Sequence, residues 1–140
     1  MDETNARNLV PEMFPEKPQF ACVDCSFISG DKVIAPLKNL LGEPGFIVWL
    51  LKPQFEAGPG KVGKGGVIRK DDVLEMAITE ALDRIHIIGA SVIDCCESPI
   101  RGADGNREYL VLLRFSGAGI SIADCLARML KQDQNEEPQN

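Results

Sequence analysis

The chain has 140 residues, of which 44% are hydrophobic and 26% carry a charge. It is too apolar for a disordered tail and too mixed for a fibrous protein, so we expect one soluble globular domain or part of a larger one. A formal net charge of −6 argues against a protein that coats nucleic acid generally, because phosphate binding draws on a surplus of Lys and Arg.

The packed part of the chain is expected to start near residue 20. Residues 1–19 hold three prolines and no sustained periodicity, which indicates an irregular lead-in. Residues 20–24 are apolar and stand between a proline and a serine, as expected of a buried strand that ends in a polar tip.

A helix and a second strand follow. Apolar residues between Asp31 and Leu41 recur at helical spacing, which predicts a helix capped by Asp31 and stopped by Gly42. Residues 46–51 are uniformly apolar, which is typical of a strand in a parallel sheet. The order strand, helix, strand indicates one right-handed parallel unit.

The second half predicts another helix and a hairpin. After a glycine-rich segment, Asp72 and Glu75 resemble a capping box that starts a helix ending at Gly89. Residues 90–96 and 108–115 are predicted strands joined by a turn-rich loop, and they form an antiparallel hairpin at the sheet edge.

A short amphipathic helix is expected over residues 120–130, followed by a disordered tail over residues 132–140. The predicted organisation is thus a lead-in (1–19), a packed part (20–131) and the tail. The fold class is α/β, with four strands of which the last is antiparallel, and flanking helices. A sheet of this type is expected to continue beyond its first strand, so the set of elements looks incomplete.

The sequence also indicates where in the cell the protein is expected. The longest apolar run, residues 46–51, falls far short of the roughly 20 residues that a helix needs to cross a bilayer. The N-terminus is acidic and polar, unlike a secretory signal, and the five cysteines are an odd set that is typical of reduced thiols. We expect a cytoplasmic protein without membrane contact.

No metal site is predicted. Cys22 and Cys25 have a C-x-x-C spacing, but no second cysteine pair matches it and the only histidine is His86. Cys95 and Cys96 are neighbours on a strand and should face apart, so packing is their expected role.

Three polar residues are expected to meet at one rim of the sheet. Asp24 and Lys52 stand where the first two strands end, and Glu108 begins the last strand. In an open sheet the carboxyl ends of parallel strands border the ligand crevice, and an antiparallel strand starts at that same edge. The alternative is that these are ordinary polar residues at strand ends, two of them joined by a salt bridge.

A basic segment lies between the second strand and the second long helix. Lys61, Lys64, Arg69 and Lys70 fall within ten residues that contain no acid, and Arg107 lies in a second loop. Such a cluster can bind phosphate, but charge alone favours the alternative of two solvated loops.

An ordered series of motifs resembles the hemolysin-like (TlyA-type) ribosomal RNA 2′-O-methyltransferases, whose catalytic domain is FtsJ-like. The resemblance extends over roughly residues 4–115. Its motifs are T-N-A-R at 4–7, D-C-S-F-I-S at 24–29, K-P-Q-F-E-A-G at 52–58, V-G-K-G-G-V at 62–67, S-P-I at 98–100 and G-N-R-E at 105–108.

The resemblance implies part of a Rossmann-like sheet that binds S-adenosylmethionine and methylates ribosomal RNA. It assigns catalysis to Asp24, Lys52 and Glu108. Cofactor binding falls to Asn5, Ala6, Asp24 and Ser26, and RNA binding to Lys61, Lys64, Arg69 and Arg107.

Family members begin with an RNA-binding S4-like domain and a glycine-rich cofactor loop, and they carry a further catalytic lysine. None of these has a counterpart here, so the chain resembles the C-terminal half of such an enzyme. We expect it to bind the cofactor poorly and to methylate RNA slowly or not at all by itself.

In the mechanism that the resemblance implies, Lys52 helps to remove the proton of a ribose 2′-hydroxyl. A free lysine titrates near 10.4 and must be neutral to act as a base, whereas two nearby carboxylates favour the charged form. The alternative function is a non-catalytic RNA-binding or partner-completed module. It would form a homodimer, or join a separate N-terminal half, through the exposed sheet edge.

Overall fold

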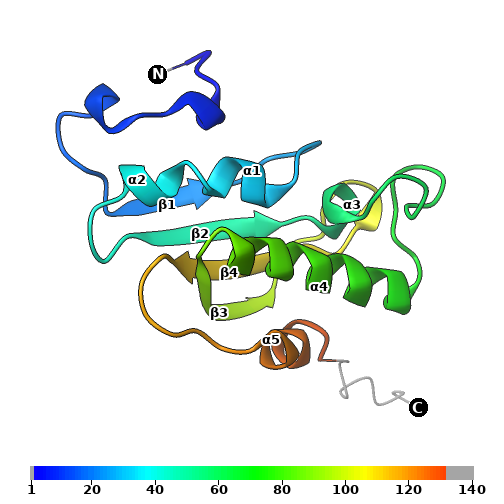
Figure 1. Cartoon of the computed structure of the whole chain (residues 1–140). Helices are drawn as coiled ribbons and strands as arrows, with labels where there is room; N and C mark the ends of the chain where they lie inside the picture. Colours follow the sequence, from blue (N-terminus) through cyan, green and yellow to red (C-terminus); the bar gives the residue numbers. More distant parts are fainter. Residues whose placement is uncertain (1, 132–140) are drawn as a thin grey trace.

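A computed structural model describes residues 2–131, which form one mixed sheet with helices packed on it (Figure 1). The strand order is β1-β2-β4-β3, and only β4 runs antiparallel to the others. The strands are β1 (Phe20–Val23), β2 (Phe46–Leu51), β3 (Ser91–Glu97) and β4 (Tyr109–Arg114). The predicted fold class, with four strands and an antiparallel last strand, is confirmed.

The helices are short except for one. Figure 1 shows α1, α2 and α4 on one side of the sheet and α5 beside β3. Their bounds are α1 (Gly30–Ile34), α2 (Leu37–Leu40), α3 (Pro53–Glu56), α4 (Asp71–Ile87) and α5 (Ile122–Met129). Three 3₁₀ turns, η1 (Ala6–Asn8), η2 (Pro11–Met13) and η3 (Ala103–Gly105), lie in the lead-in and in the loop before β4.

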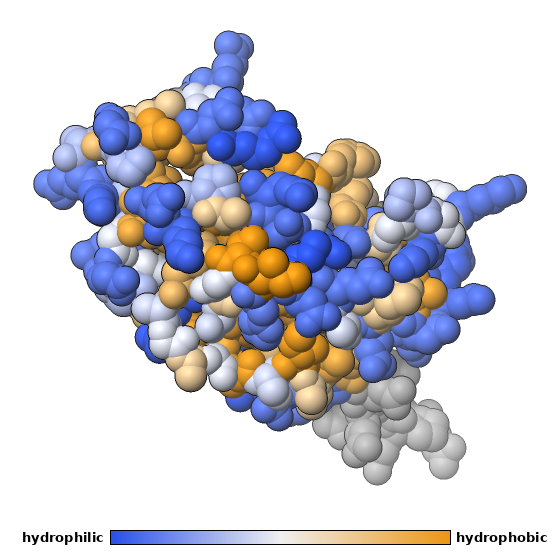
Figure 2. Space-filling view, in the orientation of Figure 1, coloured by the Kyte–Doolittle hydropathy of each residue, from blue (hydrophilic) through white to orange (hydrophobic). Residues whose placement is uncertain are grey.

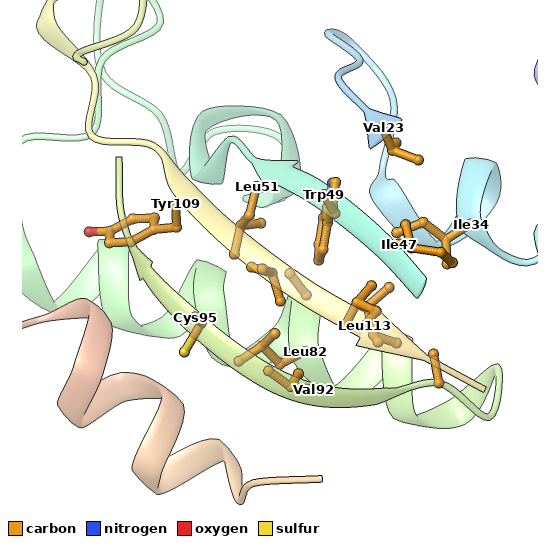
Figure 3. Close-up of a cluster of buried hydrophobic side chains, with 14 of the residues drawn as sticks. Val23, Ile34, Ile47, Trp49, Leu51, Leu82, Val92, Cys95, Tyr109 and Leu113 are labelled. Atoms are coloured by element: carbon orange, nitrogen blue, oxygen red, sulfur yellow. The ribbon is translucent and has the colours of Figure 1, made fainter. Parts of the chain in front are cut away.

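The core lies between the sheet and the helices. Alternate residues of β2 and β4 are buried, so each strand presents one face to the helices. Ile47, Trp49 and Leu51 meet side chains of α4 such as Leu82, and Figure 3 shows this cluster. Burial of this apolar surface is the main force that holds the helices on the sheet.

The opposite face of the sheet carries no helix in the described part of the chain (Figure 1). We call it the open face. Its side chains are apolar but only partly buried or exposed, and they include Phe20, Cys22, Val48, Leu110 and Leu112. The helix side, shown in Figure 2, is instead covered largely by hydrophilic side chains with apolar patches between them.

The helix predicted from Asp31 to Leu41 is wrong as one element. The structure has two short helices, α1 and α2, separated at Ala35 and Pro36. Proline has no backbone N–H to donate and its ring crowds the preceding turn, so a continuous helix is interrupted there. Ser29, rather than Asp31, occupies the N-cap position.

The capping box at Asp72 is also wrong. Helix α4 begins at Asp71, with Lys70 at the N-cap, two residues before Asp72, and no side chain caps it. The Asp72 carboxylate instead accepts a hydrogen bond from the Val73 N–H. The predicted end at Gly89 is confirmed, because this glycine has a φ of +89°, a conformation that favours glycine.

The remaining segments differ in small ways. The hairpin of β3 and β4 is confirmed, with β3 at the sheet edge, whereas α3 was not predicted. The predicted disordered tail, 132–140, lies outside the described residues. Between residues 2 and 131, no helix combines the length and apolar character that crossing a membrane requires.

Candidate active site

Strand alternation places the three predicted catalytic residues on the open face at one rim. Residues at every second position of β1, β2 and β4 point to this face. Asp24, Lys52 and Glu108 continue that alternation one position beyond their strands. Leu51 pairs with Tyr109, so Lys52 and Glu108 follow as the next opposed positions of β2 and β4.

Asp24 and Lys52 meet directly. Lys52 Nζ lies 2.7 Å from Asp24 Oδ1 and donates a hydrogen bond of 3.3 Å to Ser26 Oγ. The Lys52 side chain is 15% exposed, whereas that of Asp24 is 64% exposed. Most of the Lys52 side chain is therefore shielded from water, whereas the Asp24 carboxylate that it contacts faces solvent.

Glu108 does not join this ion pair among the described residues. Its side chain is 8% exposed and its carboxylate packs against Gly102, where an added Cβ would lie 2.1 Å from Oε1. Gly102 thus leaves the space that the carboxylate occupies. The prediction that all three residues converge is met for Asp24 and Lys52, and Glu108 takes the neighbouring position.

An aromatic pair joins the segments that follow Asp24 and Lys52 in the chain. Phe27 is 91% exposed, has a φ of +62°, and its ring centroid lies 4.7 Å from that of Phe55. A left-handed backbone is unusual for a bulky residue, and the exposed ring contributes little to folding. Sequence reasoning missed this pair, although both residues lie within the quoted motifs.

The two loops that carry Asp24 and Lys52 are joined by Glu56. Its carboxylate accepts hydrogen bonds from the Gly30 N–H at 2.7 Å and from Arg84 Nη2 at 2.6 Å. It also shares the hydroxyl proton of Ser29, whose Oγ lies 2.8 Å away, with the Asp31 carboxylate. The Glu56 side chain is only 4% exposed. Neither Glu56 nor Arg84 was predicted as a site residue, because nothing in the spacing of the sequence links positions 28 residues apart.

The predicted RNA-binding residues differ in their surroundings. Lys64 and Arg69 are exposed, whereas Lys61 lies 3.4 Å from Glu80. Lys61, Arg69 and Lys70 line a hollow of about 400 Å³ in front of α4. We call this the basic hollow.

Arg107, the fourth predicted RNA contact, already has a partner. It donates two hydrogen bonds to the carboxylate of Glu97, one of them 2.9 Å long from Nε. These bonds lower the pKa of Glu97, and the same contact raises the pKa of Arg107. Burial raises the pKa of the adjacent Tyr109 to about 12.

Asn106 connects the basic segment to the rim. Its amide donates to Gly66 O at 2.9 Å and accepts from the Ile68 N–H at 3.2 Å. It stands two residues before Glu108, so the glycine-rich loop is attached next to the predicted catalytic residue. The G-N-R-E motif contains Asn106, but the sequence alone did not show what it contacts.

The predicted cofactor residues fall into two groups. Ala6 and Asp24 line one largely apolar hollow of about 350 Å³ along β1, which we call the β1 hollow. Asn5 accepts a hydrogen bond from the Arg7 N–H, and Ser26 accepts one from Lys52. A mostly apolar lining with few polar groups is typical of sites that bind small molecules.

The described residues contain no cluster of three or more metal-binding side chains, and all five cysteines are free. Cys95 is buried and Cys96 exposed, which confirms that these neighbours face apart.

Comparisons with known proteins identify relatives of this chain. The sequence model for FtsJ-like methyltransferases matches residues 1–115. Hemolysin A of Brachyspira hyodysenteriae is 40% identical over 111 residues, which cover 79% of this chain and 46% of that protein. The 16S/23S rRNA (cytidine-2′-O)-methyltransferase TlyA of Mycobacterium tuberculosis is 35% identical over 114 residues, which cover 81% of this chain and 42% of that protein.

A solved structure is similar as well. A hemolysin-like protein from Lactococcus lactis superimposes with a TM-score of 0.80 at 39% identity, over 90% of this chain and 63% of that one. The chain therefore spans less than half the length of these two curated relatives.

Proposed function

Because the chain belongs to the FtsJ-like methyltransferase family, we propose that it takes part in S-adenosylmethionine-dependent methylation of a ribose 2′-hydroxyl in ribosomal RNA, in the cytoplasm. The observation that carries this proposal is the Asp24–Lys52 pair, 2.7 Å apart at the rim of the sheet. The M. tuberculosis relative is named for the same reaction on 16S and 23S rRNA.

Lys52 is the residue that we assign to the ribose hydroxyl. Its amine stands at the rim beside Asp24, and in its neutral form it accepts the hydroxyl proton. An ion pair is made by the ammonium form, which donates hydrogen bonds but cannot accept a proton. Before it accepts the ribose proton, Lys52 must therefore release Asp24 and lose its extra proton to solvent. Glu108 follows at the next opposed position as a second carboxylate.

S-adenosylmethionine supplies a methyl group carried on a positively charged sulfur. We assign its binding to Ala6 and Asp24 in the β1 hollow, with Asn5 and Ser26 at the margins. The hollow runs along the unpaired edge of β1, so it is open on one side. We therefore propose that the chain alone binds the cofactor weakly and methylates slowly, and that polypeptide added beside β1 closes the hollow.

The RNA contacts that we propose lie on both sides of Lys52. The exposed Lys64 and Arg69 offer charges to phosphates, as does Lys61 in the basic hollow. The Phe27–Phe55 pair offers a ring on which an unstacked base can lie. Arg107 can contact a phosphate only after its hydrogen bonds to Glu97 break.

The decisive experiment is the substitution Lys52→Met. Methyl transfer from labelled S-adenosylmethionine to ribosomal RNA is measured with the chain alone and with the unmatched half of the M. tuberculosis relative added as a separate polypeptide. We expect transfer to need the added half and to fall at least about 100-fold in Lys52→Met, with RNA binding nearly unchanged. Full transfer by Lys52→Met would contradict the assignment, and tight calorimetric binding of the cofactor to the chain alone would contradict the proposed weakness.

A second candidate function is a partner-completed or RNA-binding module without catalysis. The unpaired edge of β1 and the apolar open face favour it, because exposed edges and apolar patches of this kind mark association surfaces. Light scattering at high concentration tests self-association through this edge, since a clean monomer counts against it. If RNA binding persists but no combination of polypeptides transfers methyl, this second function is the correct one.

A further inference from the structure

The contact between Asp24 and Lys52 does not by itself fix the distance between the loops that carry them. The Asp24 side chain is 64% exposed. Ion pairs of this exposure contribute little, because water screens them and both side chains lose freedom. The pairing of β1 with β2 and the Phe27–Phe55 contact already bring the two loops together. A further connection between the loops bears on the position of the Lys52 amine.

Glu56 supplies that connection. It closes the single turn of α3, and its carboxylate reaches across to the loop after β1. There it accepts a hydrogen bond from the Gly30 N–H at 2.7 Å. Ser29 Oγ lies 2.8 Å from it and also contacts the Asp31 carboxylate, so the two carboxylates share the single hydroxyl proton of Ser29. Charge-assisted hydrogen bonds to a shielded carboxylate are shorter and stronger than neutral ones.

Arg84 holds Glu56 in this place. Its Nη2 lies 2.6 Å from Glu56 Oε2, and its Nε lies 3.5 Å from Asp31 Oδ1. Arg84 belongs to α4, the longest helix of the described chain, whose buried face packs in the core. A carboxylate that is only 4% exposed requires a countercharge, and Arg84 provides it from a fixed element.

The turn between Lys52 and Glu56 transmits this position. Pro53 fixes the backbone directly after Lys52, the Phe55 N–H bonds to Lys52 O at 2.9 Å, and the Ala57 N–H bonds to Pro53 O at 2.9 Å. Lys52 and Glu56 are therefore the two ends of one short rigid unit. Displacing the Glu56 carboxylate displaces the base of the Lys52 side chain.

We propose that Glu56, held by Arg84, is a positioning residue for Lys52. It touches neither the substrate nor the reacting atoms. It attaches the loop after β2 to the loop after β1, and it thereby keeps the Lys52 amine against Asp24. The meaning of this role for catalysis rests on the proposed function, but the placement of the amine can be measured without it.

The test uses the chemical reactivity of individual lysines. The 140-residue chain is dimethylated with formaldehyde and a borane, and the rate at Lys52 is read by mass spectrometry relative to the exposed Lys64. Glu56→Gln removes the charge that binds Arg84, so we expect Lys52 to react at least about threefold faster than in the unchanged chain. Asp24→Asn, which removes the partner itself, should raise the rate by a similar factor.

Matched controls separate positioning from a general loss of structure. Asp83→Asn removes an acid from an exposed neighbour of Arg84 on the same helix, and it should leave the Lys52 rate unchanged. If Glu56→Gln does not fold, Arg84→Lys and Ser29→Ala, which each weaken the network less, are measured in the same way. An unchanged Lys52 rate in the folded variants, alongside a faster rate in Asp24→Asn, overturns the proposal.

Methyl transfer gives the second readout. In the complemented assay, Glu56→Gln should lower kcat by about 10- to 100-fold and leave the KM for RNA nearly unchanged, as expected when a reacting group is misplaced. Absence of transfer by every protein, including the unchanged chain, would refute the proposed function, while the Lys52 rates would still decide the positioning role. Equal kcat values for Glu56→Gln and the unchanged chain would overturn that role.

Discussion

On the helix side of the sheet, Ile47 and Leu113 are fully buried beneath the helices, whereas on the open face their chain neighbours Val48 and Leu112 are only partly covered. Both faces are built from similar aliphatic residues. They differ in their neighbours, because the described helices pack on one face only (Figure 1). The apolar character of a strand therefore does not by itself show which face is in the core.

The two faces also differ in which residues they carry. Asp24, Lys52 and Glu108 continue the alternation of the open face, and the buried cluster in Figure 3 lies on the other face. The helix side supplies the rigidity, including Arg84, and the open side presents the polar rim. We therefore expect substitutions on the two faces to have different consequences.

The largest expected difference concerns the thiols. Cys22 and Cys96 are exposed on the open face, whereas Cys95 and Cys125 are buried between β3 and α5. Their mutual hydrogen bond and burial raise the pKa of Cys95, which further slows its reaction. We expect iodoacetamide to label the exposed pair on the order of a thousandfold faster, measured by mass spectrometry in the native protein.

The same labelling can also contradict the stated difference between the two faces of the sheet. Equal rates at all four thiols would mean that α5 does not cover β3 in solution. Protection of Cys22 and Cys96 that appears only when the added half of the relative is present would show that this polypeptide covers the open face.

A smaller difference is expected between two neighbouring leucines. Leu113→Ala empties a fully buried position and should lower the free energy of unfolding by about 3 kcal/mol. Leu112→Ala, on the open face, should lower it by at most about 1 kcal/mol. Urea denaturation measures both. A loss for Leu112→Ala that grows with protein concentration would show that a second copy packs on this face.

On the helix side, a buried tyrosine should make the stability of the fold depend on pH. Burial raises the pKa of Tyr109 to about 12, above the value near 10 of an unfolded chain. The folded state thus holds this proton more tightly. Its contribution is fully present below pH 10 and is lost as the pH rises from 10 through 12, by on the order of 2 kcal/mol.

Tyr109→Phe provides the control for that measurement. The Tyr109 hydroxyl is buried without a hydrogen-bond partner among the described residues, so its removal should not destabilise the protein at pH 7. Urea midpoints at pH 9 and pH 11.5 should then differ less in the variant. An identical loss in both proteins would assign the alkaline instability to other groups.

The smallest effect is expected for an exposed ion pair. Arg128 Nη1 lies 2.6 Å from Asp94 Oδ1 on the surface, and the Cys95 N–H together with Arg128 lowers the pKa of Asp94. Arg128→Ala should cause almost no loss of stability in urea denaturation, because water screens this pair. A larger loss would mean that solvent screens this edge of the sheet less than its exposure implies.

The sequence was informative where one local rule acts alone. The apolar run 46–51 gives β2 with its observed bounds, and strand ends bordering a crevice predict the meeting of Asp24 with Lys52. The helix from Asp31 failed because periodicity was followed past Pro36, whose missing N–H interrupts the helix.

The missed parts of the site depend on contacts between distant segments. Glu56 meets Ser29 and Arg84 only after β1, α3 and α4 have packed together. No sequence pattern within any one of these segments predicts the contacts. The position of Glu108 depends likewise on the space left by Gly102. Residue types at strand ends predict which groups gather at a rim, whereas the bonds that hold them there require the packed structure.

Asn106 holds the glycine-rich loop through main-chain atoms alone, the Gly66 carbonyl and the Ile68 N–H. Such an anchor is indifferent to the side chains that the loop displays. Apart from Gly65 and Gly66, whose positive φ values favour glycine, the loop can therefore change charge, size or hydrophobicity while its attachment next to Glu108 stays the same. An engineer could use the same freedom to graft different side chains onto one unchanged scaffold.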